Sequence, residues 1–281
     1  MNGPLVAGMA LTSWVAMATV MALAWRVALR TGNAGWIDVF WTFGLGVIGV
    51  AAVGVLLSPW LPAASSFAPV APRALLAAAL LAAWSLRLGA HILGRTRRND
   101  DDPRYAQLRE EWGARYASRL FLFLQVQALA GVPLLLAVVV AAGRPGPFGD
   151  VQDGLALAVC LVAVAGEALS DRALRRFARA PHRREAVCET GPWRWSRHPN
   201  YFFEWLGWCA WPVLALHAGH PWGCITLLAP LLMYVLLVHV SGIPPLEAHM
   251  ARSRGAAWRD YAARTPAFFP WPPRSARRPP A

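Results

Sequence analysis

Hydrophobic residues form seven long stretches along the chain, separated by shorter polar segments. The stretches lie at residues 4–29, 36–57, 73–94, 120–142, 154–178, 201–218 and 222–241. A helix needs about 20 mostly apolar residues to cross the hydrocarbon core of a membrane, and each stretch is near or above that length. The pattern therefore predicts an all-α polytopic membrane protein with about seven transmembrane helices.

The first stretch is expected to stay in the protein. No charge occurs between Met1 and Trp25, so the basic region that opens a cleaved signal peptide is missing. No repeat with a period of 20–50 residues is visible, which disfavours a transporter built from two related halves. We expect one domain over residues 1–270 and a disordered tail over 271–281, which is rich in proline and arginine.

Composition excludes several classes of protein. Apolar residues make up 57% of the 281 positions and charged residues only 15%, which rules out a disordered chain and leaves too little polar surface for a water-soluble globule. A soluble nucleic-acid binder is therefore not expected, although the net charge is +12. The four cysteines form no C-x-x-C pair, so neither a metal site nor a disulfide framework is predicted.

All 27 basic residues are arginine, and they gather in alternate connections. Two follow the first stretch, seven lie between 95 and 119, eight between 172 and 197, and seven between 252 and 278, whereas the opposite connections hold only Arg73 and Arg144. Positive charge near helix ends is held on the cytoplasmic side. Seven spans then predict an external N-terminus and a cytoplasmic C-terminus.

Acidic residues in apolar stretches are costly and are candidates for a functional site. Asp38 begins the second stretch, Glu204 opens the sixth, and Glu167 and Asp171 share a helix face near the end of the fifth. The alternative for the last pair is an ion-pair ladder at the membrane surface, with Arg175 one turn further on.

The segment from Glu189 to Glu204 has the densest polar chemistry. Pro199 suits the first turn of a helix, and a helix N-terminus offers free N–H groups and a positive dipole end to a phosphate. Arg197 and His198 add charge beside it, and Tyr201 could stack on a base. An interfacial belt of aromatic and arginine side chains is the alternative.

Three other motifs are read as structural. Gly44, Gly46 and Gly49 spell a dinucleotide-binding pattern, but they lie in an apolar stretch, where close helix packing explains them better. His217 and His220 lie in a turn without a carboxylate or thiolate nearby, so we expect no metal there. Glu247 and His249 are expected to be solvated interface residues.

Taken together, these residues resemble the steroid 5α-reductase-like membrane proteins, and more closely their bacterial branch. The segment GPWRWSRHPNYFFE at 191–204 carries the resemblance. Further matches follow in order along the chain: Asp38 to Trp41, Trp84 to Leu88, Arg95, Asp102 to Tyr105, Gln125, Gln127, Glu167, Asp171, and Trp258 to Tyr261. Residues 119–270 would carry the cofactor-binding signature.

The resemblance implies a reductase that binds NADPH from the cytoplasmic side and reduces the carbon–carbon double bond of an enone lipid, typically a 3-oxo-Δ4 steroid. It implies cofactor contacts at Arg95, Arg104, Tyr105, Asp171, Arg175, Asn200, Glu204 and Tyr261, and at Arg252 or Arg254. Arg197, His198 and Tyr201 join this set because of their own chemistry. The expected location is the bacterial cytoplasmic membrane, with a hydrophobic lipid-like substrate and surrounding lipids as partners and no obligate protein partner.

The reaction needs a proton donor on the enone oxygen. Characterised relatives use a glutamate in the second span and a tyrosine in the third, and this chain has neither. Asp38, in an apolar cavity, is the candidate general acid, with His91 as a second candidate; Asp38 could instead cap its helix or pair with Arg87 or His91.

Two other functions stay open. The isoprenylcysteine carboxyl methyltransferase-like proteins share the Arg-His-Pro-x-Tyr element and bind S-adenosylmethionine. That family commonly has adjacent glutamates after its last span, where this chain has only Glu247. A non-catalytic lipid-binding protein is the third possibility.

Overall fold

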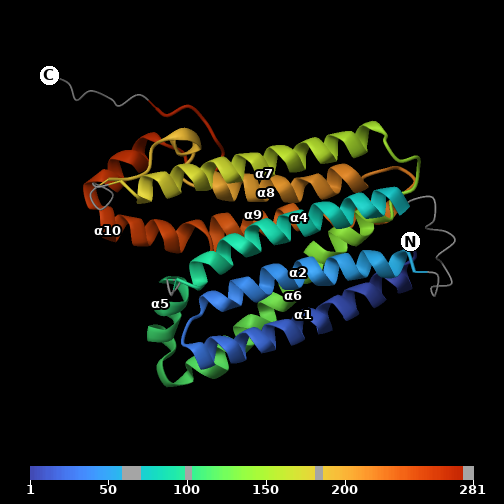
Figure 1. Ribbon diagram of the computed structural model, residues 1–281, viewed down its shortest axis with the longest axis horizontal. Helices are drawn as coiled ribbons and strands as arrows, with labels where there is room; N and C mark the ends of the chain where they lie inside the picture. Colours follow the sequence, from blue (N-terminus) through green and yellow to red (C-terminus); the bar gives the residue numbers. More distant parts are fainter. Residues whose placement is uncertain (59–70, 99–102, 181–185, 275–281) are drawn as a thin grey trace. The chain divides into compact units, whose positions relative to one another are not determined.

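The computed structural model describes residues 1–58, 71–98, 103–180 and 186–274, and within these ranges the chain forms helices and no strand (Figure 1). The longer helices are α1 (Gly3–Thr31), α2 (Gly35–Leu56), α4 (Ala71–Thr96), α5 (Pro103–Trp112), α6 (Tyr116–Ala142), α7 (Val151–Ala178), α8 (Pro199–Ala215), α9 (Leu228–Val235) and α10 (Ile243–Arg264). Shorter elements are the 3₁₀ turns η2 (Gly113–Arg115), η3 (Gly191–Arg194) and η4 (Pro221–Leu227) and the π-helical turn η5 (Leu236–Val240).

Every predicted apolar stretch forms a helix, which confirms an all-α polytopic membrane protein. Six helical segments in the described ranges are long and apolar enough to cross a membrane. Large apolar side chains on their outer faces are exposed, such as Val126 at 65% and Leu161 at 60%, as a lipid-facing surface requires. The sixth predicted stretch is shorter than expected: α8 has 17 residues, because the polar turn around His217 and Gly219 ends it early. The predicted outer turn at 59–62 lies outside the described residues.

Contacts divide the chain into two compact units. Unit 1 comprises residues 1–156 and 211–229, and unit 2 comprises residues 157–210 and 230–281. In unit 1, α1, α2, α4 and α6 run side by side (Figure 1). The prediction of one domain over 1–270 stays a prediction.

Glycines let the helices of unit 1 approach closely, as expected for the Gly44–Gly49 motif. A Cβ atom added to Gly46 would lie 2.1 Å from the Ser85 hydroxyl, and one added to Gly49 would lie 2.3 Å from Leu81. Since real Cβ atoms do not approach so closely, both α2 positions need glycine to pack against α4. The packing interpretation of this motif is confirmed.

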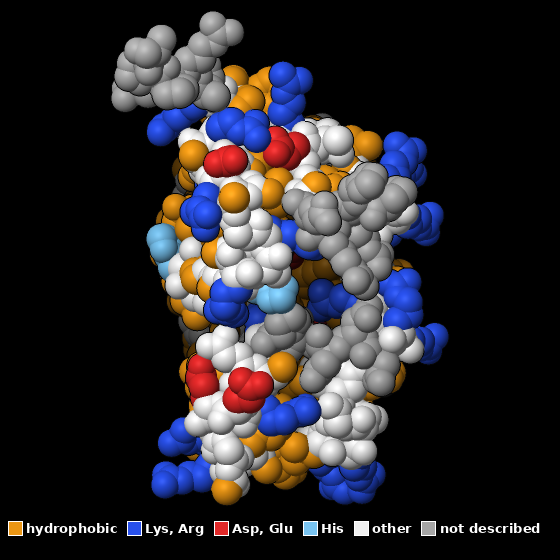
Figure 2. Space-filling view, turned by 90° about the vertical axis from the view of Figure 1, so that its left-hand side faces the viewer, with side chains coloured by type: hydrophobic (Ala, Val, Ile, Leu, Met, Phe, Trp, Pro, Cys, Tyr) orange, Lys and Arg blue, Asp and Glu red, His pale blue; other side chains and the backbone are white. Residues whose placement is uncertain are grey.

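One end of unit 1 joins the connections that the arginine count singled out. Asn33, between α1 and α2, donates to the Thr96 carbonyl at the end of α4 (3.0 Å), and Arg109 of α5 donates to the Gly32 carbonyl (3.1 Å). Trp25 of α1 reaches the Ala117 carbonyl at the start of α6 (2.8 Å). Figure 2 shows arginine side chains projecting from one face of the molecule between hydrophobic ones.

The two arginines assigned to the opposite connections are buried and paired. Arg73 is 0% exposed and donates to both carboxylate oxygens of Asp153, at 2.7 and 2.9 Å. Arg144, 1% exposed, donates to Asp153 (2.9 Å) and to both oxygens of Asp150 (2.8 and 2.9 Å). Arg144 holds the pKa of Asp150 well below its usual range. Two positive and two negative side chains therefore neutralise each other here.

In unit 2, α7 and α8 pack closely, because Gly166 lies under the ring of Phe203. Trp193 of η3 donates to the Ser170 carbonyl of α7 (2.9 Å), and Trp205 of α8 donates to the Pro230 carbonyl of α9 (3.1 Å). Phe268 packs edge-on against Trp205 at a centroid distance of 5.8 Å. The C-terminal segment is thus anchored on the helices.

Backbone hydrogen bonds hold the first four residues of the predicted disordered tail. The Trp271 N–H donates to the Trp195 carbonyl and the Arg274 N–H donates to the Arg264 carbonyl, both at 2.9 Å. These backbone bonds fix residues 271–274, and residues 275–281 lie outside the described residues.

Candidate functional site

A hydrogen-bonded cluster at the start of α2 joins three separate segments of unit 1. Arg104 of α5 pairs with one carboxylate oxygen of Asp38, and the Tyr105 hydroxyl donates to the other at 3.2 Å. The Gln127 amide of α6 lies 3.5 Å from the Tyr105 hydroxyl. The Arg104 guanidinium also lies over the Tyr105 ring, 5.6 Å from its centroid. We call Asp38, Arg104, Tyr105 and Gln127 the Asp38 cluster.

The surroundings predicted for Asp38 are wrong. Its side chain is 21% exposed and meets a guanidinium and a phenol rather than an apolar cavity. Both carboxylate oxygens of Asp38 accept hydrogen bonds from these protein donors. Asp38 also lies in the first turn of α2, where the helix dipole favours a negative charge. Tyr105, whose hydroxyl carries the proton of the hydrogen bond to Asp38, is 2% exposed.

The other predicted residues of unit 1 lie along α4. His91 is on an exposed face of this helix, and Arg95 is half-buried in its last turn. Near the end of a helix, Arg95 faces the negative end of the helix dipole.

In unit 2, Arg197 connects the segment before α8 to α10. Its guanidinium donates to both carboxylate oxygens of Glu247, at 2.8 and 3.1 Å, and to the carbonyls of Ala262 (2.9 Å) and Thr265 (2.7 Å). A guanidinium has five N–H donors, and four of them are engaged here. Most of its donors thus satisfy protein acceptors, and the expected contact between Arg197 and a cofactor phosphate stays a prediction.

His198 shares the same carboxylate. Its Nε2 lies 3.0 Å from Glu247 Oε1, and its ring stacks on Tyr201 at a centroid distance of 5.6 Å. Burial lowers the pKa of His198, although the carboxylate opposes this effect. His198 is therefore neutral at pH 7 and donates from Nε2 to Glu247, so its predicted charge for a phosphate is absent.

Glu247 is the residue that the sequence analysis missed. It was expected to be solvated, but it is the common acceptor for Arg197 and His198. We call these three residues the Glu247 latch. The only sequence signal for it was a single acidic residue shortly after the last apolar stretch.

Tyr261, a predicted cofactor contact, is buried and hydrogen-bonded within the protein. Its side chain is 2% exposed and its hydroxyl donates to the Trp193 carbonyl at 2.6 Å. The Ser196 hydroxyl donates to the Phe268 carbonyl at 2.9 Å. Together with the Glu247 latch, these bonds fix the segment from Trp193 to His198 against the C-terminal part of the chain.

The first turns of α8 carry two polar side chains, Asn200 and Glu204, on one face. The half-buried Asn200 side chain makes no hydrogen bond within the described parts of the chain. Glu204, one turn later on the same face, is 8% exposed and accepts from Trp208 at 2.9 Å. The backbone N–H groups that open a helix have no partner inside it. Asn200 and Glu204 therefore present an amide and a fixed acceptor at a helix N-terminus.

The remaining predicted residues of unit 2 lie on α7 and α10. Glu167 and Asp171 are both buried on α7, at 6% and 8% exposure, and the alternative of an ion-pair ladder at the membrane surface stays open. Arg175 is exposed near the end of α7, Arg252 is exposed on α10, and Arg254 is half-buried just before the backbone kink at Gly255.

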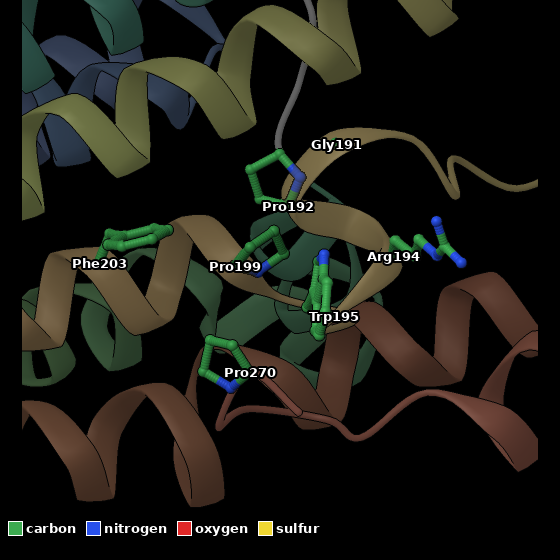
Figure 3. A pocket seen from close by; sticks show the side chains of 7 residues that line it. All are labelled: Gly191, Pro192, Arg194, Trp195, Pro199, Phe203 and Pro270. Carbon is green, nitrogen blue, oxygen red and sulfur yellow. The ribbon is translucent and has the colours of Figure 1, made fainter. Parts of the chain in front are cut away.

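An open apolar pocket of about 450 Å³ lies beside the start of α8 in unit 2 (Figure 3). Pro192, Trp195, Pro199, Phe203 and Pro270 line it, and the Arg194 side chain extends away from their rings. Its residues Pro199 and Phe203 are one helical turn apart, on a different face of α8 from Asn200 and Glu204. Such a lining suits an aromatic ring or a lipid chain.

A family model described as "Protein of unknown function (DUF1295)" matches residues 24–265. The chain belongs to this family. No curated protein and no solved structure matches the chain.

Proposed function

We propose that this membrane protein is an NADPH-dependent reductase that acts on the carbon–carbon double bond of an enone lipid in the bacterial cytoplasmic membrane. The Asp38 cluster carries the proposal. Three segments that the sequence analysis singled out separately, at 38–41, 102–105 and 125–127, contribute to this one group. It contains a phenol, which can donate a proton, held by a carboxylate and a guanidinium.

The proposed chemistry assigns proton donation to Tyr105. A nicotinamide, when bound, would supply the hydride for the β-carbon of the enone. The Tyr105 hydroxyl proton would pass to the enone oxygen, where negative charge develops, and give an enol. The enol would then take a proton from water at the α-carbon and return its hydroxyl proton to the Tyr105 phenolate, which leaves the saturated ketone and hydroxide. The Arg104 guanidinium over the ring stabilises that phenolate. Asp38 is then a positioning residue, which holds both Arg104 and Tyr105.

The cofactor contacts are proposed at residues that the resemblance names. In unit 2 these include Asn200, whose amide lies beside the first N–H groups of α8, and Arg175, which is exposed on α7. In unit 1, taken by itself, they include Arg95. A charge-assisted hydrogen bond to phosphate is worth about 1.5–3 kcal/mol, so Arg95→Ala should weaken NADPH binding by roughly ten- to a hundredfold. Affinity that is unchanged in both Arg95→Ala and Asn200→Ala would place the cofactor elsewhere.

The experiment that tests the function begins with purified protein in detergent, titrated with NADPH, NADH and S-adenosylmethionine. A panel of enone lipids is then assayed with the preferred cofactor. Tyr105→Phe should leave NADPH affinity nearly unchanged and lower turnover by about 10²–10⁴, the usual loss with a general acid. Tyr116→Phe, at the start of α6, is the matched control and should keep its turnover. Normal turnover in Tyr105→Phe would remove this residue from the reaction.

One observation favours the methyltransferase as the second candidate. Glu247, the one glutamate after the last span, contacts Arg197 and His198 of the element shared with that family. Tighter binding of S-adenosylmethionine than of NADPH in the same titration would make this the better proposal.

A further inference from the structure

A second pocket of unit 2, separate from the proposed reductase chemistry, is basic. It has a volume of about 480 Å³ and lies along the C-terminal segment that follows α10. Its lining includes three arginines and two aromatic residues, namely Arg197, Arg264, Arg274, Phe269 and Trp271, and no acidic residue lines it.

Two of these arginines, Arg264 and Arg274, have guanidinium N–H groups that make no hydrogen bond within the described residues. The Arg274 guanidinium has no protein partner within the described residues. Arg264 donates to Glu189 from Nη2 and to the Asp260 carbonyl from Nε, which leaves its Nη1 group for a ligand. Arg197 adds positive charge at the rim, although Glu247 and two backbone carbonyls use four of its five donors. The pocket therefore suits an anion that accepts several hydrogen bonds at once.

The pocket is preformed, because backbone hydrogen bonds fix the segments that line it. Arg197 N–H donates to the Pro266 carbonyl, Trp271 N–H to the Trp195 carbonyl, and Arg274 N–H to the Arg264 carbonyl, each at 2.9 Å. A fixed wall lowers the ordering cost of binding.

The surroundings point to a lipid as the source of the anion. Trp271 is 72% exposed and Phe269 51%, and Arg197 stands two residues before the apolar helix α8. Exposed aromatic rings and arginines at the end of an apolar helix are typical of the membrane interface, where the rings lie at the level of the lipid headgroups. An exposed tryptophan beside the Arg274 guanidinium suits a phosphate that carries a lipid chain, because inorganic phosphate offers the tryptophan no apolar contact.

We propose that this pocket binds the phosphate of an anionic phospholipid, with Arg264 and Arg274 as donors and with Phe269 and Trp271 against the glycerol and upper acyl region. Each arginine near an anionic membrane surface contributes about a fivefold change in affinity. Loss of both should weaken retention of the lipid roughly thirtyfold.

Native mass spectrometry of the full-length protein in detergent tests the proposal. The protein is mixed with equal amounts of dioleoylphosphatidylglycerol and dioleoylphosphatidylcholine, and bound lipid is counted. We expect the wild type to retain more phosphatidylglycerol than phosphatidylcholine. Retention of phosphatidylglycerol should fall about fivefold in Arg274→Gln and about thirtyfold in Arg264→Gln/Arg274→Gln, each relative to the wild type. Arg274→Gln is the cleaner variant, because that side chain has no protein bond to lose. Arg259→Gln, an exposed arginine on α10 outside the pocket, is the matched control and should retain lipid as the wild type does.

Two further arms separate the sources of phosphate. Trp271→Ala should reduce retention of phosphatidylglycerol, and inorganic phosphate at millimolar concentration should not displace this lipid. Displacement by inorganic phosphate, with no effect of Trp271→Ala, would show a free-phosphate site and overturn the proposal. Equal retention in the wild type and Arg264→Gln/Arg274→Gln would also overturn it.

Discussion

Removal of the Glu247 carboxylate should loosen the segment before α8 without changing the size of any side chain. Glu247→Gln keeps the shape but cancels the charge that Arg197 and His198 share. The Arg197 and Glu247 side chains are only 13% and 24% exposed, so water can replace little of the lost interaction. Breaking a buried pair costs about 3–5 kcal/mol, and partial exposure of Glu247 lowers our expectation to about 2–3 kcal/mol.

A thermal scan of the detergent-solubilised protein measures this loss. At about 2–4 °C per kcal/mol for a chain of this size, the midpoint of Glu247→Gln should fall by roughly 4–12 °C. Glu189→Gln is the matched control, since its pair with Arg264 is 39% and 37% exposed. Such a surface pair contributes about 0–1 kcal/mol, so its midpoint should fall by less than about 4 °C. Equal shifts in the two variants, at one scan rate, would refute the reasoning that burial makes the Glu247 latch the stronger pair.

Four more outcomes follow from the same contacts. Asp153→Asn should destabilise the protein by about 3–5 kcal/mol, because the buried Arg73 and Arg144 both lose the carboxylate that they share. The same thermal scan measures this loss. Gly46→Ala should lower the midpoint through a clash with Ser85, at a cost of about 1–3 kcal/mol; Gly54→Ala, with open space around it, should not. Burial keeps the pKa of His198 below its ordinary value of 6.5, so the unfolded chain binds a proton that the folded chain excludes, and stability is lost as pH falls below 6.5. Scans at pH 7.5 and 5.5 should show a smaller loss in His198→Gln than in the wild type. For the topology, a cysteine at exposed Ala114, in a background without Cys224, should resist an impermeant thiol reagent added outside cells, whereas one at exposed Ala218 should react; the reverse pattern would invert the predicted orientation.

The helices could be predicted from the sequence because hydrophobicity over about 20 residues is a local property. All seven stretches became helices, and the packing glycines on α2 were recognised because small residues in an apolar stretch allow close contact. The predicted stretch ended at residue 218, but α8 ends three residues earlier, at Ala215, because the chain turns at 216–220.

The site was harder to predict because its pairs join residues far apart in the chain. Asp38 was recognised as unusual, but its partner Arg104 is 66 positions away, and nothing local separates Arg104 from 26 other arginines. The same holds for Arg197 and Glu247, which are 50 positions apart. The resemblance singled out Asp38, Arg104 and Tyr105, which the structure brings together, whereas tertiary contacts decide which protein acceptors an arginine meets.

The buried pairs of unit 1 also bear on the predicted orientation. The positive-inside rule counts arginines near helix ends because exposed positive charge resists transfer across the membrane. Arg73 and Arg144 were the two exceptions in the count, yet each is at most 1% exposed and bonded to aspartate. Their charges cancel against Asp150 and Asp153, so this end of unit 1 presents neither arginine to water. The asymmetry behind the prediction is therefore sharper than the sequence count indicated, and the orientation of unit 1 depends on its other, arginine-rich end.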